Sequence, residues 1–349
     1  MAKKSGDNES KVLEKAIDDI LKTYGEGAIQ KTTGGVVTPV DSFSTGSIGL
    51  DIAIGVGGVP RGRITEIVGE ESTGKSTICL NVVKSCQIRG LRAAYIDHEQ
   101  ALDLDYAQSL GVDTDDLYLS QPGCGEQGLD IAQRLMETGE FGVVVFDSIA
   151  AMSPKSEMEG EFGDSTMGAQ ARMMSQALRK MSVVIRQQNV ATLFTNQYRS
   201  KIGVMFGDPR VPTGGNAMKF WASVRLDMSK SVSAANLVKD GDEVLGNLVT
   251  AKVFKNKVSA PFKKAEFDIL YGSGVNRNGE LLTIGQRFNI VVKRGAFFSY
   301  GDTRLGQGFV NACEFLKQND SIAKEIETKI LSSVKSGEIL VTTEDKEDF

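Results

Sequence analysis

The chain has 349 residues, and 40 Lys and Arg against 45 Asp and Glu give it a formal net charge of −5. Hydrophobic residues at 41% and charged residues at 24% are ordinary for a globular protein and exclude disorder over most of the length. No apolar run reaches the roughly 18–20 residues of a membrane span, and the N-terminus lacks the apolar core of a signal peptide. We therefore expect a cytoplasmic protein with no membrane contact. Four scattered cysteines and a single histidine, His98, argue against a disulfide framework, a zinc site or catalysis by a His cluster.

The first predicted element is an amphipathic helix over residues 8–23, where apolar side chains recur at helical spacing between charged ones. A Gly- and Thr-rich stretch, 25–35, follows and is typical of a linker. A helix on such a tether could pack on its own core or on that of a neighbouring copy, and the composition does not distinguish the two.

From about residue 37 to 275 the pattern alternates apolar strands with helices. The predicted strands are 64–68, 93–97, 143–147 and 192–197, and the predicted helices are 76–87 and about 168–189. This alternation predicts an α/β fold with a mostly parallel twisted sheet covered on both faces. Strand-like pieces joined by short turns, at 223–226, 248–254 and 266–270, predict an added antiparallel edge.

The alternation of strands and helices stops near residue 276. Helices predicted at 309–316 and 321–334 indicate a small α-rich C-terminal domain, 276–340, before an acidic tail, 341–349. The predicted organisation is thus an N-terminal helix and linker, 1–36, a core, 37–275, then this domain and the tail.

Charge is distributed unevenly. Residues 251–300 contain nine Lys or Arg against three acids, a net +6 within a chain of −5. Such a segment is either a solvated basic face or a contact for a polyanion, which would be nucleic acid or nucleotide phosphate.

The strongest motif is the segment 69–76, which fits the phosphate-binding pattern G-x-x-x-x-G-K-[ST] between a predicted strand and a helix. Its glycines allow backbone N–H groups to converge on phosphate oxygens at a helix N-terminus. Lys75 would place a charge near the β- and γ-phosphates, and the Ser76 hydroxyl would ligate Mg²⁺. The motif predicts a nucleoside triphosphate and Mg²⁺ as ligands.

Two acids follow buried strands. Asp147 ends the strand 143–147, where it would hold Mg²⁺ beside the phosphate loop. Glu99 follows the strand 93–97 at the rim where such sheets bind ligands, and could act as the base for the attacking water. Strand alternation would put Asp97 and Glu99 on one face and His98 on the other, so His98 is expected to pack or to meet solvent.

The strand 192–197 ends in Asn196-Gln197, whose amides could bond the γ-phosphate or simply satisfy backbone groups. A long glycine-punctuated basic loop, 198–215, follows directly. Because it is attached to a candidate phosphate sensor, this loop could order or disorder with nucleotide state.

With these motifs in place, the chain resembles the RecA family of bacterial recombinases over about residues 30–340. The resemblance is carried by these segments: GEESTGKST (69–77), IDHEQALD (96–103), VFDSIAAMSPKSEMEGEFGDSTMG (145–168), ARMMSQALRK (171–180), FTNQYRSKIGVMFG (194–207), TGGNAMKF (213–220) and KNKVSAPFKKAEFDILYGSG (255–274). It implies a DNA-dependent ATPase that forms ATP-dependent filaments on single-stranded DNA, pairs homologous DNA and exchanges strands in recombination and repair. It also implies duplex DNA, further copies of the chain and a LexA-type repressor of the SOS response as partners.

The resemblance also implies roles in the ATP site. Glu99 matches the hydrolytic glutamate, Asp147 the Mg²⁺-associated aspartate and Gln197 the glutamine that senses the γ-phosphate. Lys255 and Lys257 match lysines that reach ATP from the adjacent protomer. The expected nucleotide contacts are Gly69, Glu70, Glu71, Ser72, Thr73, Gly74, Lys75, Ser76, Thr77, Asp103, Tyr106 and Asp147, with Mg²⁺ on Ser76 and Asp147.

Two DNA loops, about 157–168 and 197–215, are placed by the same resemblance. The first is acidic, so Met167 would insert beside bases while a following helix meets the backbone; for a lone methionine, core packing is the default. Backbone contacts position DNA without reading its sequence. The expected DNA contacts are Met167, Arg172, Ser175, Arg179, Arg199, Lys201, Ile202, Gly214, Gly215 and Asn216, and the expected interface residues are Lys219 and Phe220.

The chain departs from the family pattern at Gln100, where relatives usually have His, so a role for that histidine does not carry over. Three alternative functions remain to be tested against a recombinase. They are a ring-shaped DNA motor of the same ATPase class, a small-molecule phosphotransferase, and a non-hydrolysing assembly protein.

Overall fold

The computed structural model describes residues 3–25, 28–29, 40–161, 168–200, 210–231, 237–240 and 243–336. The chain forms two compact units, residues 1–39 and 40–349. The first unit contains helix α1 (Lys3–Tyr24), whose Val12 and Leu13 are exposed. The helix predicted over 8–23 is therefore confirmed and begins earlier than its apolar pattern does.

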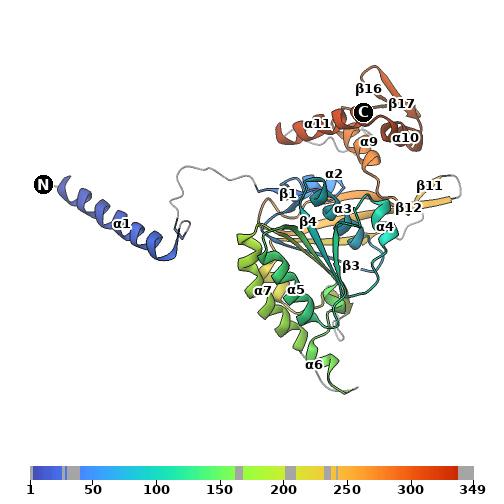
Figure 1. Ribbon diagram of the computed structural model, residues 1–349. Helices are drawn as coiled ribbons and strands as arrows, with labels where there is room; N and C mark the ends of the chain where they lie inside the picture. The colour runs from blue at the N-terminus through green and yellow to red at the C-terminus, as the bar shows by residue number, and fades with distance from the viewer. Residues whose placement is uncertain are drawn as a thin grey trace. The chain divides into compact units, whose positions relative to one another are not determined.

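A ten-stranded sheet organises the second unit (Figure 1). Its strands are, in spatial order, β14 (Gly274–Val275), β13 (Lys264–Leu270), β12 (Glu243–Asn256), β10 (Val224–Lys230), β3 (Ile64–Gly69), β7 (Ala191–Asn196), β6 (Phe141–Asp147), β4 (Arg92–Asp97) and β5 (Leu117–Ser120), with β11 (Leu237–Asp240) paired to β12. The pairings from β10 to β5 are parallel, and those from β14 to β10 are antiparallel. The predicted α/β fold, with a mostly parallel core and an antiparallel edge, is confirmed.

The central strands bury both faces, because alternate residues of each strand enter different cores. In β6, Val143 and Val145 join one cluster while Val144 and Phe146 join the other. Helices α2 (Ile48–Ile54), α3 (Lys75–Ile88) and α4 (Leu104–Ser109) contribute to the first cluster, and α5 (Gly125–Glu137), α7 (Ala169–Gln187) and α8 (Ala217–Trp221) contribute to the second. This two-sided burial explains why β4 and β6 are nearly continuous apolar runs that end in an aspartate, whereas β3 and β7 also bury polar residues such as Glu66 and Thr192 within the strand.

The C-terminal region has a core of its own, which Ile48 of α2 joins. Its helices are α9 (Arg277–Arg287), α10 (Phe309–Gln318) and α11 (Asp320–Ser336). A three-stranded antiparallel sheet lies among them in sequence: β15 (Val292–Arg294), β16 (Phe297–Tyr300) and β17 (Thr303–Gln307). The two predicted helices are confirmed, whereas this sheet was not foreseen.

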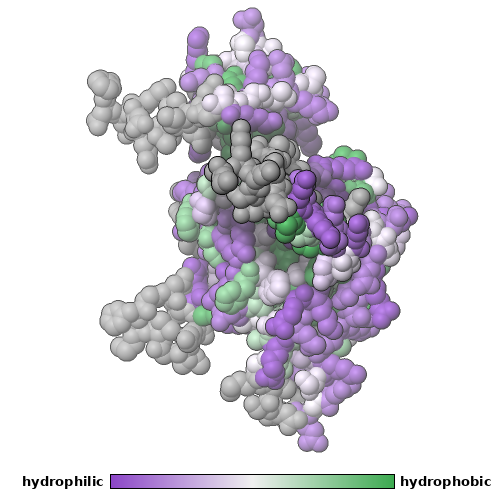
Figure 2. Space-filling view, turned by 90° about the vertical axis from the view of Figure 1, so that its left-hand side faces the viewer, coloured by the Kyte–Doolittle hydropathy of each residue, from purple (hydrophilic) through white to green (hydrophobic). Residues whose placement is uncertain are grey.

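Short elements complete the second unit: β1 (Ser42–Phe43), β2 (Val59–Pro60), a 3₁₀ turn (Ile149–Ala151), α6 (Lys155–Met158), β8 (Tyr198–Ser200) and β9 (Arg210–Pro212). Hydrophilic side chains dominate the described surface of the face in Figure 2, and apolar ones form scattered patches. Among the described helices, none has the length and apolar character that crossing a bilayer requires.

Candidate functional site

The phosphate loop connects β3 to α3, and its two glycines occupy positions where a side chain would clash. Ser72 and Gly74 have positive φ angles of +57° and +84°. A Cβ on Gly69 would lie 2.5 Å from the Met228 carbonyl oxygen, and one on Gly74 would lie 2.2 Å from Ile269 Cδ1. These contacts explain the two glycines of the motif as positions where backbone approaches its neighbours closely.

Lys75 is held against the loop it belongs to. Its Nζ donates to the carbonyl oxygens of Gly69 at 3.2 Å and Glu70 at 2.7 Å. Burial lowers the pKa of Lys75, while the nearby carboxylates of Asp147 and Glu99 oppose that shift. The ammonium is thus placed at the phosphate loop among carboxylates.

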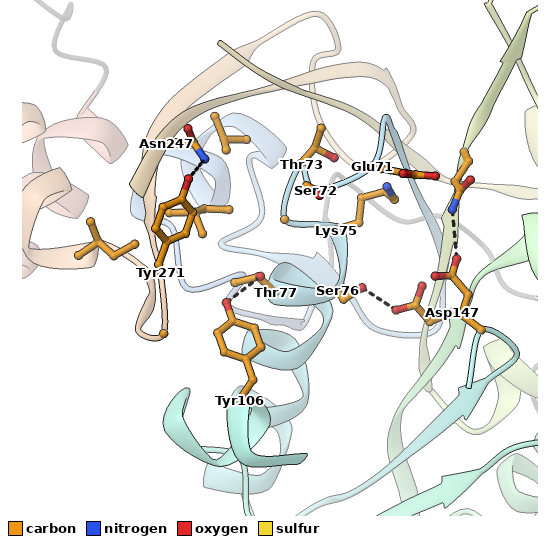
Figure 3. A pocket seen from close by; sticks show the side chains of 17 residues that line it. Glu71, Ser72, Thr73, Lys75, Ser76, Thr77, Tyr106, Asp147, Asn247 and Tyr271 are labelled. Atoms are coloured by element: carbon orange, nitrogen blue, oxygen red, sulfur yellow. Dashed lines mark hydrogen bonds between the residues drawn. The ribbon is translucent and has the colours of Figure 1, made fainter. Parts of the chain in front are cut away.

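A cavity of about 550 Å³ lies over this loop (Figure 3). Its lining is Glu71, Ser72, Thr73, Gly74, Lys75, Ser76, Thr77, Glu99, Tyr106, Asp147, Gln197, Asn247, Val249, Ile269, Leu270, Tyr271 and Gly272. Figure 3 shows Lys75, Ser76 and Asp147 at one side and the rings of Tyr106 and Tyr271 at the other. The cavity therefore has a polar, charged end and an aromatic end, as a nucleotide requires.

The cavity brings together most of the predicted nucleotide contacts. Gly69, Glu70 and Asp103 do not line it. Asp103 instead caps α4, accepting from the Tyr106 N–H at 2.9 Å, and Tyr106 shares a 3.0 Å hydrogen bond with Thr77. Sequence reasoning missed Asn247 and Tyr271, which are joined by a 2.7 Å hydrogen bond from Asn247 Nδ2. They come from β12 and the turn after β13, far away in sequence, and no local signal points to them.

Ser76 and Asp147 supply adjacent oxygens at the charged end. The Ser76 hydroxyl donates to Asp147 Oδ2 at 2.7 Å. Tyr95 also donates to Oδ2, and Thr195 donates to Oδ1, each at 2.5 Å. Hard oxygen ligands of this kind fit Mg²⁺, which keeps most of its shell for water and phosphate oxygens. Tyr95 and Thr195 fix the carboxylate from neighbouring strands.

Glu99 lies in the cavity with one carboxylate oxygen held from two sides. Ser148 Oγ donates to Glu99 Oε1 at 2.5 Å, and Gln197 Nε2 donates to the same oxygen at 3.2 Å. The predicted base and the predicted sensor are therefore in direct contact. Ser148, which follows the strand-end Asp147, was missed.

Asp97 has a different environment from Glu99. Strand β4 ends at Asp97, so the alternation that predicted a shared face does not extend to Glu99. Asp97 is buried and accepts from the Leu102 N–H and Gln121 Nε2, both at 3.1 Å. His98 packs against Gly128, where a Cβ would lie 2.5 Å from its Nε2. Burial lowers the pKa of His98 to about 4, which suits a packed neutral imidazole.

Lys255 and Lys257 do not line the cavity of their own chain. Both ammonium groups reach the end of α8: Lys255 Nζ donates to the Lys219 carbonyl at 2.5 Å, and Lys257 Nζ donates to that of Phe220 at 3.4 Å. Burial lowers the pKa of Lys255 to about 8, and the charges of Lys257 and Arg225 add to the effect. The Phe220 side chain beside them is 74% exposed.

The predicted DNA contacts divide between described and undescribed residues. Met167, Lys201 and Ile202 lie outside the described residues. Arg172, Ser175 and Arg179 follow one another at helical spacing on α7, with both arginines exposed. Arg199 is exposed on β8, and Gly214, Gly215 and Asn216 lie immediately before α8.

The backbone at Gly214 and Gly215 requires glycine. Their φ angles are +78° and +72°. A Cβ would lie 2.8 Å from Ile149 Cγ2 at Gly214 and 2.7 Å from Ala171 Cβ at Gly215. The end of the second loop is thereby packed against the start of α7, so the two predicted DNA segments adjoin.

Comparison with known proteins agrees with this architecture. Residues 11–276 match the family model described as the RecA N-terminal domain, and residues 279–335 match that of the RecA C-terminal domain. Similar relatives, each named Protein RecA, include that of Wolinella succinogenes, 49% identical over 98% of this chain and 97% of its own. That of Azoarcus sp. is 52% identical over 93% of both chains, and that of Rhodospirillum rubrum is 51% identical over 93% of this chain and 87% of its own.

These matches extend over both the phosphate-loop core and the C-terminal region. The chain therefore belongs to the RecA family, and is a DNA-dependent ATPase and recombinase of recombination and repair.

Proposed function

We propose that the cavity over the phosphate loop binds ATP with Mg²⁺, and that a second copy of the chain completes the site. Lys75 would neutralise phosphate charge, and Ser76 and Asp147 would hold the metal ion, which supplies charge stabilisation when bound. Glu99 would accept the proton of the attacking water. Asp103 and Tyr106 would lie around the adenine.

The observation that carries this proposal is the contact of Glu99 with both Ser148 and Gln197 inside a cavity that also contains Lys75 and Asp147. A base held in one orientation is ready to direct a water molecule at phosphorus. Gln197 would exchange its bond to Glu99 for one to the γ-phosphate. This exchange would signal the nucleotide state to the loop that follows it.

We further propose that Lys255 and Lys257 act on the ATP of the adjacent copy, with Lys219 and Phe220 in the same interface. Their ammonium groups bond backbone carbonyls at the end of α8, beside an exposed phenylalanine. Cations supplied in trans can stabilise the transition state of phosphoryl transfer, as an arginine finger does. ATP would then bind between successive copies in a helical filament.

Single-stranded DNA would bind along the two loops. Met167, Arg172, Ser175 and Arg179 would contact it from the first loop and α7, and Arg199, Lys201, Ile202, Gly214, Gly215 and Asn216 from the second. Duplex DNA would enter as the partner for exchange. From family membership we also propose a cytoplasmic location and co-activation of a LexA-type repressor in the SOS response.

The test is ATP turnover with and without single-stranded DNA at low salt, together with negative-stain imaging in a non-hydrolysable ATP analogue. We expect DNA to stimulate turnover and to template open helical filaments. Closed rings would favour the DNA motor. Turnover without salt-sensitive DNA affinity would favour the phosphotransferase, and tight ATP binding with no turnover would favour an assembly protein.

A further inference from the structure

The two ends of the second loop pair as β8 and β9, and next to this pairing they also meet at the side chain of Asn196. Its Oδ1 accepts from the Gln197 N–H at 2.9 Å, where the loop begins, and from the hydroxyl of Thr213, where the loop ends. Its Nδ2 donates to the Thr213 carbonyl at 3.1 Å, and the Thr213 N–H donates to the Gln197 carbonyl at 3.3 Å. Asn196 is fully buried, whereas Gln197 and Thr213 are half-buried, so these bonds are shielded from water at the Asn196 end.

A buried ion pair determines which way the Asn196 amide faces. Glu66 on β3 is fully buried, accepts from Arg225 Nε on β10, and accepts from Asn196 Nδ2 at 2.9 Å. A carboxylate only accepts hydrogen bonds, so it requires the NH₂ group of Asn196. The amide oxygen is then left for Gln197 and Thr213. The ion pair thereby selects the one amide orientation that joins both loop ends.

Two further hydrogen bonds connect the loop end to the 3₁₀ turn that follows β6, the strand that ends at Asp147. The Gly214 N–H donates to Gln170 Oε1 at 3.1 Å, and Gln170 Nε2 donates to the Ile149 carbonyl at 2.7 Å. Ile149 lies two residues after Asp147. Movement of Thr213 would therefore reach the start of α7 as well as the second loop.

We propose that Asn196, oriented by the Glu66–Arg225 pair, clamps the two ends of the second loop together, so that displacement of Gln197 by a nucleotide phosphate moves the loop end with it. Thr213 is the positioning residue at that end. The inference rests on the proposed function, in which Gln197 meets the γ-phosphate and the loop meets DNA. What it adds is the Asn196 clamp, which would pass the movement of Gln197 to the other end of the loop without using the residues that contact DNA.

The test removes the Thr213 hydroxyl in a nearly isosteric Thr213→Val variant. The readout is the ratio of single-stranded DNA affinities in a slowly hydrolysed ATP analogue and in ADP, measured by fluorescence anisotropy with a labelled oligonucleotide. We expect this ratio to fall by about three- to tenfold, the net worth of one hydrogen bond. Thr213→Ser retains the hydroxyl and should restore the ratio.

The control is Thr192→Val. Thr192 Oγ1 on β7 is buried and has no hydrogen-bond partner among the described residues, so its loss should leave the ratio unchanged. Equal thermal midpoints for the two valine variants would exclude a general loss of stability.

An unchanged ratio in folded Thr213→Val, or equal weakening of DNA affinity in both nucleotides, would overturn the clamp. If the wild-type protein binds DNA equally tightly in the ATP analogue and in ADP, the proposed function is contradicted instead. Glu66→Gln provides a second variant, because its amide can face Asn196 with NH₂ and permit the flipped orientation. We expect it, where folded, to lower the ratio at least as much as Thr213→Val.

Discussion

Two side chains, Ser148 and Gln197, orient Glu99, the proposed catalytic base. A carboxylate on an exposed segment has many rotamers, and a water held by a mobile base attacks slowly. Ser148 and Gln197 both bond the same oxygen of Glu99, which leaves the second oxygen for water. Gln197 is expected to leave for the γ-phosphate, so Ser148 would remain as the fixed partner during hydrolysis.

Glu99→Gln should abolish hydrolysis while ATP and DNA binding persist. An amide of the same shape cannot accept the water proton, and loss of a general base typically costs 10²–10⁴ in rate. Steady-state phosphate release and filter binding of nucleotide measure the two properties. Asp105→Asn, a charge loss at an exposed acid on α4, serves as the control and should hydrolyse normally. Substantial turnover by Glu99→Gln would remove the residue from its proposed role.

Ser148→Ala should lower kcat about tenfold with little change in KM. The variant deletes one hydrogen bond that orients Glu99, without touching the phosphate loop. DNA-saturated steady-state kinetics separate the two constants. A rise in KM at constant kcat would indicate that Ser148 binds substrate instead, and Ser148→Thr should recover much of kcat.

At the scale of elements, the join between α9 and α2 contains two buried carboxyl groups. Glu280 accepts from the Ser47 hydroxyl at 2.8 Å and from the N–H groups of Ile48 at 3.1 Å and Gly49 at 2.9 Å. Burial raises the pKa of Glu280 to about 7, with a contribution from the Asp51 charge, although the Gly49 and Ser47 donors oppose the rise. Burial likewise raises the pKa of Asp51 to about 6, and Arg277 faces both groups.

The raised pKa of Glu280 predicts that the free energy of unfolding declines as pH rises. Glu280 titrates near 4.5 when unfolded and near 7 when folded, so the folded state binds the proton more tightly. Its contribution is therefore greatest at acid pH and is lost as pH rises through 7. In urea unfolding, the free energy of unfolding of the wild type should fall between pH 5 and 8, and this fall should be about 2 to 3 kcal/mol smaller in Glu280→Gln. Glu314→Gln, an exposed acid on α10, should retain it; parallel pH profiles for wild type and Glu280→Gln would contradict the assignment.

Elements differed in how far the sequence could predict them. Strands β4 and β6 were predictable because burial on both faces makes them nearly continuous apolar runs that end in an aspartate. Strands β3 and β7 have a weaker pattern, because buried polar residues such as Glu66 and Thr192 interrupt them. Strands β15 to β17 have only three to five residues each and at most one buried residue each, so no hydrophobic period distinguishes them from a loop.

The residues of the candidate ATP site likewise differ in how far the sequence could predict them. Lys75, Ser76 and Asp147 follow from a local motif and a strand end, whereas Tyr271 and Thr213 reach their partners only through tertiary structure. The orientation of Asn196 by Glu66 also depends on the pairing of β3 with β7, which sequence spacing does not reveal.

At the scale of the whole molecule, the proposed division of the ATP site between two copies would make hydrolysis depend on assembly. Glu99 lines the cavity of its own chain, and Lys257 does not. A head-to-tail contact of this kind is heterologous, so every interior copy gives its lysines to one neighbour and receives those of the other. Two defective variants would then complement each other.

A mixture of Glu99→Gln and Lys257→Ala should therefore regain activity that neither variant has alone. A site with Glu99 from the Lys257→Ala copy and Lys257 from a Glu99→Gln neighbour is intact, and random equal mixing makes roughly one interface in four of this kind. DNA-stimulated turnover should accordingly return to about a quarter of wild type in equimolar mixtures and vanish at either extreme. Mixing Lys257→Ala with the double variant Glu99→Gln/Lys257→Ala supplies no intact lysine and should restore nothing. If the first mixture stays as inactive as its components while filaments still form on DNA, Glu99 and Lys257 serve the same chain's site, and the shared-site mechanism fails.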